Sequence, residues 1–574
     1  MARIEPHPDS RRCPHQRRRG ARTHRHRRVP RRPRTDVGSR SDRRGCRPRC
    51  AADVCGSRRW EPDRSVDRGG AHRHRARGRG VTAPSRGRGV TAPSRGRGVT
   101  APTDGRAARR RVVVIGGGLT GLAAAWHVRD EVDVTVLESS TDPGGQVRSV
   151  PFAGTRIDVG ADAFLARQPE GERLVRAAGF GDDDLVAPAT GQVYLWVRGR
   201  RRPLPAGTVL GAPADPVALV RSGVLPYGAV LRAGLEPVVP RREVVGDRSV
   251  ADLVGERFGR EVVDRLVEPL LGGVYAGSVD RLSAEATLPP VWSAAQRHRS
   301  LLRGLREHRA RAAADDSPVF LTIRGGLGRV IDRLAADLGT RLQTGTAVTS
   351  LARTEDGGAW RITTDGGEHL VADGVILALP AAVASGLLRD QSPAAARELS
   401  GIRAASVGVV ALAYAPEHVT DVPVGSGILV PRTEGRLVKA VTFSSRKWPH
   451  HAGHDHFLLR ASVGRVDDAT PVDPDDDRLV AAVEAEVREL AGIDGRADEA
   501  IVQRWPDSLP QYDVGHLARV DRLRAALRED APGLHIGGAS LDGVGLAARA
   551  RDGERLAHEI RWDAGLLDPA GRTG

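Results

Sequence analysis

The sequence predicts an α/β fold in which a nucleotide-binding domain is assembled from segments far apart in the chain, with other structure inserted between them. Three observations support this prediction. A strand at residues 110–116, apolar from Val112 to Ile115, runs into a glycine-rich turn and a helix. A second strand, glycine turn and helix follow at residues 534–560. Helical and strand patterns of several hundred residues separate the two units, as expected for an inserted domain.

The elements follow from hydrophobic period and turn residues. We expect a strand over 110–116, a helix over 119–129 and a strand over 132–138. Ser249, followed three residues later by Asp252, resembles a capping box, and the sequence is mostly helical from about 185 to 310. Residues 341–380 read as strands separated by Asp-Gly-Gly turns at Asp356 and Asp365. Further strands are expected near 405–465, then a helix over 475–490 and the last strand and helix at 534–560.

Residues 1–108 differ in composition from the rest. The first 111 residues contain 34 Arg and 9 acidic residues, a net charge of +25, whereas the remaining 463 carry 54 basic and 62 acidic residues, a net charge of −8. The nine-residue unit RGRGVTAPS recurs from Arg77, Arg86 and Arg95, with Thr as its last residue in the third copy. We expect a disordered Arg/Gly/Pro-rich extension, which either binds RNA or anionic lipid or lies upstream of the true start of translation.

The body of the chain excludes several kinds of chemistry. All four cysteines (Cys13, Cys46, Cys50 and Cys55) lie in the extension, so thiolate metal sites, disulfides and cysteine redox relays are not expected elsewhere. The longest uncharged apolar run, residues 374–388, is too short to span a bilayer and contains Pro380. No apolar secretory segment is evident, and we expect a cytoplasmic protein.

A dinucleotide-binding pattern follows the first strand. Gly116, Gly118 and Gly121 form G-x-G-x-x-G at the start of the helix, where glycine allows a tight turn, close approach to a pyrophosphate and close packing of helix on strand. Glu138 ends the second strand, at the position where a carboxylate accepts hydrogen bonds from a ribose. The pattern predicts a Rossmann-like domain.

The surrounding glycines favour a flavin over a nicotinamide. Gly144 and Gly145 follow Glu138 and can form a second backbone loop over a dinucleotide, and Gly537, Gly543 and Gly545 place backbone amides at another helix start. No second G-x-G-x-x-G unit with its own acid is present, so no separate nicotinamide site is expected. Dioxygen or a quinone is then the expected electron acceptor.

Several longer strings resemble one family. DVGADAFLARQP (158–169), GGVYAGSVDRLS (272–283), TFSSRKWPH (442–450) and RWPDSLPQYDVGHLARV (504–520) occur in family order. From about 111 to 562 the chain resembles the bacterial FAD-dependent oxidases of haem synthesis, the protoporphyrinogen and coproporphyrinogen oxidases, within the amine-oxidase-like flavoproteins. The resemblance implies FAD-binding segments at 109–185, 318–400 and 501–562. It also implies a mainly helical insert facing substrate or membrane at 186–317, substrate-domain strands and a helix at 401–500, and a tail at 563–574.

The resemblance also implies a set of FAD-binding residues. These are Gly116, Gly117, Gly118, Leu119, Thr120, Gly121, Glu138, Gly145, Gln146, Gly160, Ala161, Asp162, Ala163, Val348, Trp505, Gly537, Val544, Gly545 and Leu546. The chain departs from the family at four places. Gln146 replaces a basic residue, Asp158 replaces Glu, the usual G-P-D-S turn reads Gly160, Ala161, Asp162, Ala163, and VGLAARARDG (544–553) replaces a V-G-x-P-D-x-I-like stretch.

For a porphyrinogen the protein must supply a wide apolar slot and cations for carboxylates, and no catalytic side chain is required because flavin N5 carries the chemistry. Arg167 is the expected carboxylate partner, with a solvated arginine as the alternative. Tyr275, Trp448 and Tyr512 are candidate pocket aromatics, with core packing as the alternative. His450, His451, His454 and His456 lack a known ligand spacing, so we expect a solvated loop and no metal.

The resemblance implies oxygen-linked oxidation of coproporphyrinogen III to coproporphyrin III with release of hydrogen peroxide. Coproporphyrinogen is favoured because the arginine-rich composition resembles that of high-G+C Gram-positive bacteria, whose oxidases of this kind take it. Protoporphyrinogen IX oxidation, amine or carotenoid oxidation on the same scaffold, and nucleic-acid or anionic-membrane binding by the extension remain alternatives. A haem-pathway ferrochelatase and a peripheral membrane contact are further expected partners, and no nucleic acid is expected for residues 112–574.

Overall fold

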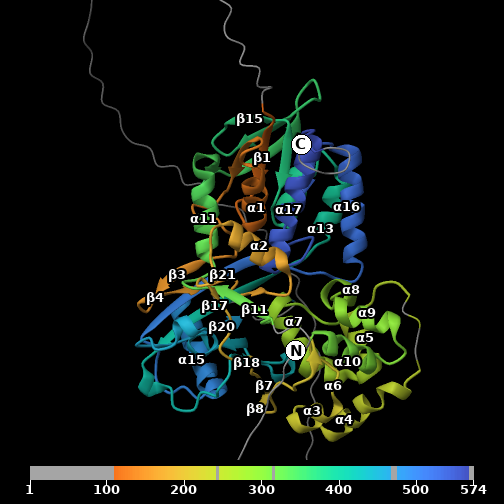
Figure 1. Cartoon of the computed structure of the whole chain (residues 1–574), viewed down its shortest axis with the longest axis vertical. Helices are drawn as coiled ribbons and strands as arrows, with labels where there is room; N and C mark the ends of the chain where they lie inside the picture. The colour runs from red at the N-terminus through yellow and green to blue at the C-terminus, as the bar shows by residue number, and fades with distance from the viewer. Residues whose placement is uncertain (1–108, 241–242, 244, 313–316, 467–474, 568–574) are drawn as a thin grey trace, which may run out of the picture. The chain divides into compact units, whose positions relative to one another are not determined.

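A five-stranded parallel sheet forms the centre of the nucleotide-binding region (Figure 1). The computed structural model describes residues 109–240, 243, 245–312, 317–466 and 475–567, so the expectations for 1–108 and for most of the tail lie outside the described residues. The strand order is β12 (Leu342–Gln343), β2 (Asp133–Leu137), β1 (Arg111–Ile115), β16 (Gly374–Leu377) and β22 (Leu534–Ile536). The predicted strands at both ends of the chain therefore meet in one sheet, with β16 between them.

Helices and a small antiparallel sheet cover the two faces of this sheet. Val112, Val114 and Ile376 pack on one face against α1 (Leu119–Val128), α11 (Gly328–Leu338) and α17 (Leu546–Asp563). Val113 and Ile115 pack on the other face. The elements there are β13 (Val348–Arg353), β14 (Trp360–Thr364), β15 (His369–Ala372), α12 (Ala381–Leu388), α13 (Pro393–Ser400) and α16 (His516–Asp530). The central strands β1 and β16 are apolar from Val112 to Ile115 and from Gly374 to Leu377 because both of their faces are buried.

A second sheet, of seven strands, lies in the inserted region. Its order is β21 (Glu499–Pro510), β17 (Ala404–Tyr414), β20 (Phe457–Val463), β19 (Val438–Thr442), β18 (Gly427–Leu429), β7 (Val193–Val197) and β8 (Arg200–Pro203). The helix α15 (Asp476–Ala491) starts at the Asp475 cap and packs Leu479 and Val483 onto one face of this sheet.

Two expectations need correction here. Residues 193–203 form β7 and β8 of the seven-stranded sheet, although the region from about 185 was expected to be mostly helical. The segment predicted to return to the nucleotide-binding domain at residue 501 begins inside β21, which pairs with β17 along most of its length. The strand β8 contains Arg200, Arg201 and Arg202, so its residues do not alternate between apolar and polar. The strand β21 is mostly half-buried. Neither strand therefore had the period-two pattern that predicts a strand.

The helical insert has its own apolar core. Its helices include α3 (Pro216–Ser222), α4 (Tyr227–Gly234), α5 (Val250–Phe258), α7 (Glu268–Tyr275), α9 (Pro289–Arg297) and α10 (Leu301–Ala312). The apolar face of α5, with Leu253, Val254 and Phe258, packs inside this core. The Ser249 hydroxyl accepts the Asp252 amide at 3.0 Å, which confirms the predicted start of α5.

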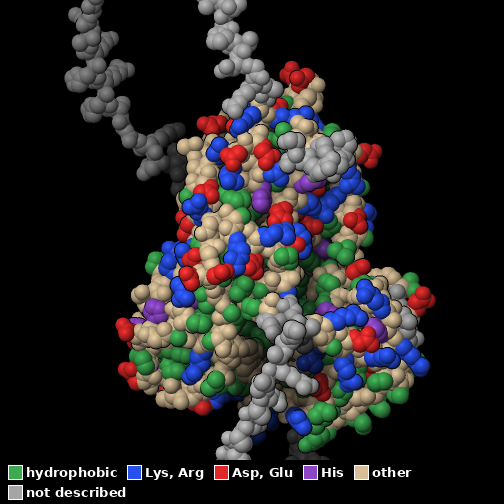
Figure 2. Space-filling view, in the orientation of Figure 1, with side chains coloured by type: hydrophobic (Ala, Val, Ile, Leu, Met, Phe, Trp, Pro, Cys, Tyr) green, Lys and Arg blue, Asp and Glu red, His purple; other side chains and the backbone are tan. Residues whose placement is uncertain are grey.

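The outer helices α3 and α4 present apolar side chains to solvent. Tyr227, Leu231 and Val217 are 89%, 66% and 55% exposed, and Val220 and Leu235 are also exposed. Hydrophobic side chains gather over α3 and α4 in the surface view (Figure 2). Among the described helices, none is long and apolar enough to cross a membrane.

A candidate dinucleotide site between two uncapped helices

The first glycine turn has the geometry that a pyrophosphate requires. Gly116 has a φ of +108°, and a Cβ there would lie 2.4 Å from the carbonyl oxygen of Ala378. A Cβ on Gly121 would lie 2.0 Å from the carbonyl oxygen of Gly116. Both positions therefore need glycine, the first for backbone conformation and the second for close packing of α1 on β1. Gly118 has open space around its Cα, which leaves room for a ligand.

The first turn of α1 keeps its amides free of side-chain caps. Its N-cap residue is Gly118, and no side chain caps the helix, whereas α3 and α5 are capped by Asp215 and Ser249. Leu119 and Thr120 follow, both buried, and the Thr120 hydroxyl is buried without a hydrogen-bond partner among the described residues. An uncapped helix start with an unsatisfied hydroxyl fits an anion such as a diphosphate.

Glu138 is held at the carboxyl end of β2, next to this turn. Its Oε2 accepts the Gly117 amide at 2.7 Å and its Oε1 accepts the Ser140 amide at 2.8 Å. The two bonds orient the carboxylate and leave lone pairs for ribose hydroxyls. Val348, partly buried at the start of β13, packs beside this end of the sheet, because the carbonyl of Glu138 accepts the Thr346 amide.

A second loop lies against the first. Gly144 bridges Gly118, and the Gly144 amide donates to the Gly117 carbonyl at 2.8 Å. Gly145 is exposed, with a φ of +55°, and the nearest atom to a Cβ there would be the Cα of Gly118, 3.6 Å away. The two predicted glycine loops thus form one continuous backbone surface.

Gln146 and the turn at residues 160–163 join this surface to β21. The Gln146 carbonyl accepts the Ala161 amide at 3.0 Å, and a Cβ on Gly160 would lie 1.9 Å from it. The Gln146 side chain donates to the carbonyl of Ser508. Trp505 donates its indole N–H to the Val159 carbonyl at 2.9 Å. Gln146 therefore connects the loop to β21.

Asp162 is the centre of an ion-pair cluster. Its carboxylate pairs with Lys447, at the end of α14 (Ser444–Lys447), at 2.8 Å and with Arg460 on β20 at 3.3 Å. Burial acts to raise the pKa of Asp162, but the two cations outweigh burial and hold the pKa well below its usual range. Ala163 follows at the end of this turn and is half-buried. The sequence did not indicate Lys447 or Arg460 as partners, because they lie about 300 residues away along the chain.

The C-terminal glycine loop leads into α17, which is also uncapped. Its N-cap is Gly545, with open space at the Cα and no capping side chain. A Cβ on Gly537 would lie 2.5 Å from Asp552 Oδ2, so this position also requires glycine. Val544 is partly buried against the helical core and Leu546 is buried.

Tyr512 fixes the conformation of this C-terminal loop. Its hydroxyl donates to the Ala539 carbonyl at 2.6 Å and accepts the Gly543 amide at 2.7 Å, and its ring stacks on His516 at 3.9 Å. Tyr512 is 2% exposed. These contacts support the alternative that Tyr512 is a packing residue, and they indicate that Tyr512 positions the loop.

The helices α1 and α17 lie side by side. A Cβ on Gly553 of α17 would contact Ala123 and the backbone of α1 near Thr120 (Figure 1). Gly553 lies eight residues after the N-cap of α17, about 12 Å along the helix axis. The start of α17 therefore lies about 12 Å, along the axis of α17, from the point where this helix packs against the first turns of α1.

The other predicted substrate residues are more dispersed. Arg167 is exposed, lies between β5 (Phe164–Leu165) and α2 (Pro169–Ala177), and donates to the carbonyl of Ala312 at 3.0 Å. The Tyr275 ring lies 5.6 Å from that of Tyr512, next to the C-terminal loop, and burial raises the pKa of Tyr275 to about 12. Trp448 is 3% exposed and lies beside the Asp162 cluster, which supports its packing alternative.

The histidine segment is not the solvated loop that we expected. His451 is buried and its ring lies 4.2 Å from that of His450. Burial lowers the pKa of His450 to about 4 and that of His451 to about 3, so both are neutral at pH 7. Among the described residues no group of three or more His, Cys, Asp or Glu is placed to hold a metal.

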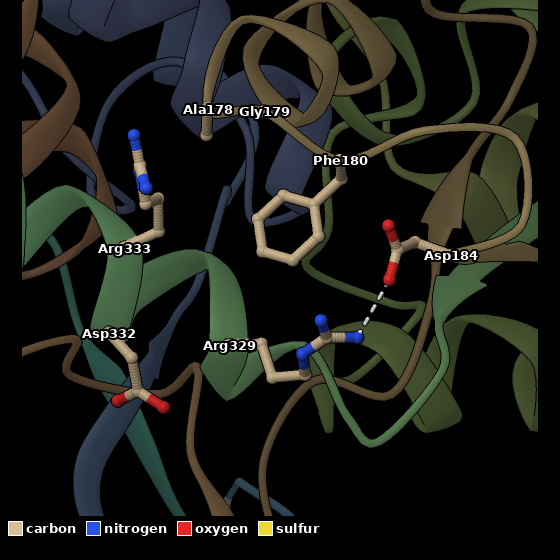
Figure 3. Close-up of a pocket in the computed structure, with 7 residues that line it drawn as sticks. All are labelled: Ala178, Gly179, Phe180, Asp184, Arg329, Asp332 and Arg333. Carbon is tan, nitrogen blue, oxygen red and sulfur yellow. Dashed lines mark hydrogen bonds and ion pairs between the residues drawn. The ribbon is translucent and has the colours of Figure 1, made fainter.

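A surface pocket of about 350 Å³ lies elsewhere, on the outer face of α11. Its lining includes Phe180, Asp184 and Arg329, and Arg329 pairs with Asp184 at 2.9 Å (Figure 3). Ile331, on another face of α11, is the residue that approaches Gly144. None of the predicted site residues lines this pocket, and both of its cations already have partners, since Arg333 pairs with Asp337 at 3.2 Å.

The glycine surface, the free helix starts and the buried Thr120 hydroxyl fit a dinucleotide, and the comparisons with known proteins agree. Residues 119–560 match the family of flavin-containing amine oxidoreductases. The chain belongs to this flavoprotein family. The predictions of an FAD-dependent oxidoreductase and of the fold class are thereby confirmed.

Individual proteins and a solved structure are also similar to most of this chain. A Bacillus subtilis protein named coproporphyrinogen III oxidase is 34% identical over 451 residues, covering 76% of this chain and 95% of that protein. One of the same name from Mycobacterium leprae is 36% identical over 446 residues, with 76% and 95% covered. A crystal structure from Exiguobacterium sp. 255-15, provisionally assigned as a protoporphyrinogen oxidase, has a TM-score of 0.71 at 30% identity and covers 79% of this chain and 99% of that one.

Proposed function

We propose that this protein oxidises coproporphyrinogen III to coproporphyrin III with dioxygen as the electron acceptor. The observation that carries the proposal is that relatives at 34–36% identity, matched over 95% of their own length, are named coproporphyrinogen III oxidases. The resemblance noted in the four sequence strings points to the same substrate class. Loss of six hydrogens in three two-electron steps would reduce three dioxygen molecules to hydrogen peroxide.

FAD would be held by the residues described above. The amides at the start of α1 and the Thr120 hydroxyl would receive the diphosphate, Glu138 the ribose, and the loop at 537–546 the ring. When bound, the flavin supplies a hydride acceptor at N5. The placement of each of these residues against the cofactor is part of the proposal.

The chain's own part is to position the substrate. No described side chain at the loop is set up as a strong base: burial raises the pKa of Tyr275 and Tyr512, so both stay protonated at pH 7. Loss of pyrrole protons to water is compatible with this. Arg167 remains the proposed partner of a substrate carboxylate, and its exposed position at the end of β5 allows such a contact.

The decisive experiment is a steady-state comparison of coproporphyrinogen III and protoporphyrinogen IX, with porphyrin fluorescence as the readout and peroxide measured in parallel. We expect kcat/KM to be at least tenfold higher for coproporphyrinogen III, and three peroxides per porphyrin. A preference for protoporphyrinogen IX, the compound in the name of the structural relative, would change the proposed substrate but keep the proposed reaction. Flavin reduction by amines and not by porphyrinogens would overturn the proposal.

We further propose a peripheral membrane contact through α3 and α4. It is supported by the exposed side chains of Val217, Tyr227 and Leu231 and by the exposed Arg221 beside them. Co-sedimentation with vesicles containing anionic lipid should fall several-fold in a Tyr227→Ser, Leu231→Ser double variant. Equal sedimentation of variant and wild type would contradict the contact.

A further inference from the structure

Arg549 is a buried cation without a partner, in the first turns of α17. The residue is 8% exposed, and its Nε and Nη2 atoms are buried without a hydrogen-bond acceptor within the described part of the chain. Burial lowers its pKa, but a guanidinium remains charged at any pH at which the protein is folded. A buried unpaired charge is among the costliest features a fold can carry.

The two nearest acids do not neutralise Arg549, because they already have other partners. Asp542 pairs with Arg524 at 2.6 Å. Asp552 pairs with Arg555 at 2.6 Å and accepts the Gly538 amide, also at 2.6 Å. The charge of Arg549 is therefore available for a group that the folded chain does not itself provide.

The side chain of Arg549 leads back toward the start of α17. In an α-helix the Cα–Cβ bonds tilt toward the N-terminus, so a long side chain lies over the preceding turn. The Arg549 amide bonds the Gly545 carbonyl, which places the residue one turn into the helix. Tyr275 and Tyr512 are its neighbours, and both lie at the C-terminal glycine loop.

Two sources of positive potential therefore meet at one point. The uncapped start of α17 has unpaired amides and the positive end of the helix dipole, and the guanidinium adds a full charge behind them. The ligand that this arrangement suits is flat, fits beside a glycine loop and carries negative charge delocalised over oxygen and nitrogen. The pyrimidine edge of a flavin gains such a charge when the ring takes up two electrons and one proton.

We propose that Arg549 is the counter-charge for the reduced flavin ring and raises the reduction potential of the bound FAD. The inference rests on the proposed placement of the ring at the 537–546 loop. Arg549 is then a positioning and tuning residue for the redox step.

The test is the affinity of the purified full-length holoenzyme for sulfite, which adds to an oxidised flavin and leaves the same negative charge on the ring. We expect Arg549→Met to bind sulfite at least tenfold more weakly than wild type, and Arg549→Lys to retain most of the affinity. For a two-electron couple a tenfold change corresponds to about 30 mV, so dye-coupled potentiometry should show a parallel decrease in potential. Arg551→Met removes a charge from an exposed position of the same helix and should change neither value.

The outcomes separate this inference from the proposed function. If the wild-type protein takes up no flavin on reconstitution, the proposed function itself is contradicted. A yellow Arg549→Met protein with unchanged sulfite affinity and a raised KM for coproporphyrinogen would assign the cation to a substrate carboxylate and overturn the flavin proposal. The flavin-free Arg549→Met protein should melt at the same temperature or higher, since an unpaired buried charge is removed; a lower melting temperature with unchanged sulfite affinity would also overturn the proposal.

Discussion

Single atoms decide the shape of the phosphate-binding turn. The carbonyl oxygen of Gly116 occupies the space that a side chain on Gly121 would need, so the spacing of the glycine pattern is a steric requirement as much as a mark of ligand binding. The motif was predictable for this reason. The partners of Asp162 were not, because the pairing depends on β20 and α14, which lie far away in the sequence.

Alanine at Gly121 should therefore be destabilising. We expect Gly121→Ala to lower the free energy of unfolding by about 2 kcal/mol or more and to weaken FAD retention, because its Cβ would overlap a backbone oxygen that cannot move away. The measurement is urea unfolding followed by circular dichroism, with flavin absorbance per chain. Gly386→Ala is the matched control: Gly386 is exposed in α12 with open space around it, so the same substitution should be stabilising by about 0.5–1 kcal/mol.

His535 should make stability depend on alkaline pH. Burial alone would lower its pKa, but hydrogen bonds to Asp563 and Glu559 outweigh burial and raise the pKa to about 9. Because the folded pKa lies above the unfolded value, the stabilisation is complete below about pH 6.5 and disappears as pH rises through 9.

The experiment compares His535→Gln with wild type in urea at several pH values. The difference in unfolding free energy should be largest near pH 6, at most about 3 kcal/mol, and should shrink toward zero by pH 10. His558→Gln, an exposed substitution on α17, the helix that carries Glu559 and Asp563, should show no such trend. A difference that stays constant from pH 6 to pH 10 would show that the charge on His535 contributes nothing.

At the level of elements, the short helix α14 and the strand β20 hold the turn at residues 160–163. Lys447 and Arg460 come from the seven-stranded sheet region, whereas Asp162 comes from the segment next to the glycine loops. The Gly160 carbonyl also accepts the Arg460 guanidinium at 2.6 Å. The ion-pair cluster therefore connects the inserted region to the candidate cofactor site.

Breaking this connection should loosen the cofactor. We expect Lys447→Met to raise the Kd for FAD several-fold, since the remaining Arg460 cannot fully compensate the Asp162 carboxylate. A double-mutant cycle with Asp162→Asn should give a coupling energy of about 1–3 kcal/mol. If the two substitutions changed the free energy of unfolding additively and left the Kd for FAD unchanged, the ion-pair cluster would contribute neither to stability nor to cofactor binding.

For the whole molecule, the sequence predicted the parallel sheet and the four strands of the mixed sheet that lie between residues 404 and 463, but not the other three strands of the mixed sheet. Val112 to Ile115 and Val375 to Leu377 are apolar runs bounded by glycine or by a clear turn, so their strands could be read directly. The strands β7, β8 and β21 are defined by pairing with distant partners, which no local pattern shows. In the same way, the glycine positions of the site were predictable, but Lys447, Arg460 and Arg549 were found only in the structure.

The Arg-rich extension should be dispensable for the flavin. The described residues belong to one compact unit, so a protein that starts at residue 100 should keep full absorbance near 450 nm and its melting temperature. Filter binding with RNA at several salt concentrations tests the alternative role of the extension. If the extension binds RNA, the affinity of the full-length protein should rise steeply as the salt concentration falls, and the shortened protein should not bind. Loss of flavin on shortening would show that the extension contributes to the cofactor site.

The order of strands in the seven-stranded sheet has one more consequence. Strands from near residue 195 and near residue 505 belong to the same sheet, and the chain enters the parallel sheet before, between and after them. Neither layer can be cut out as a continuous piece of polypeptide. Heat should therefore melt both together, in one calorimetric transition, and a ribosome must release almost the entire chain before either layer can close.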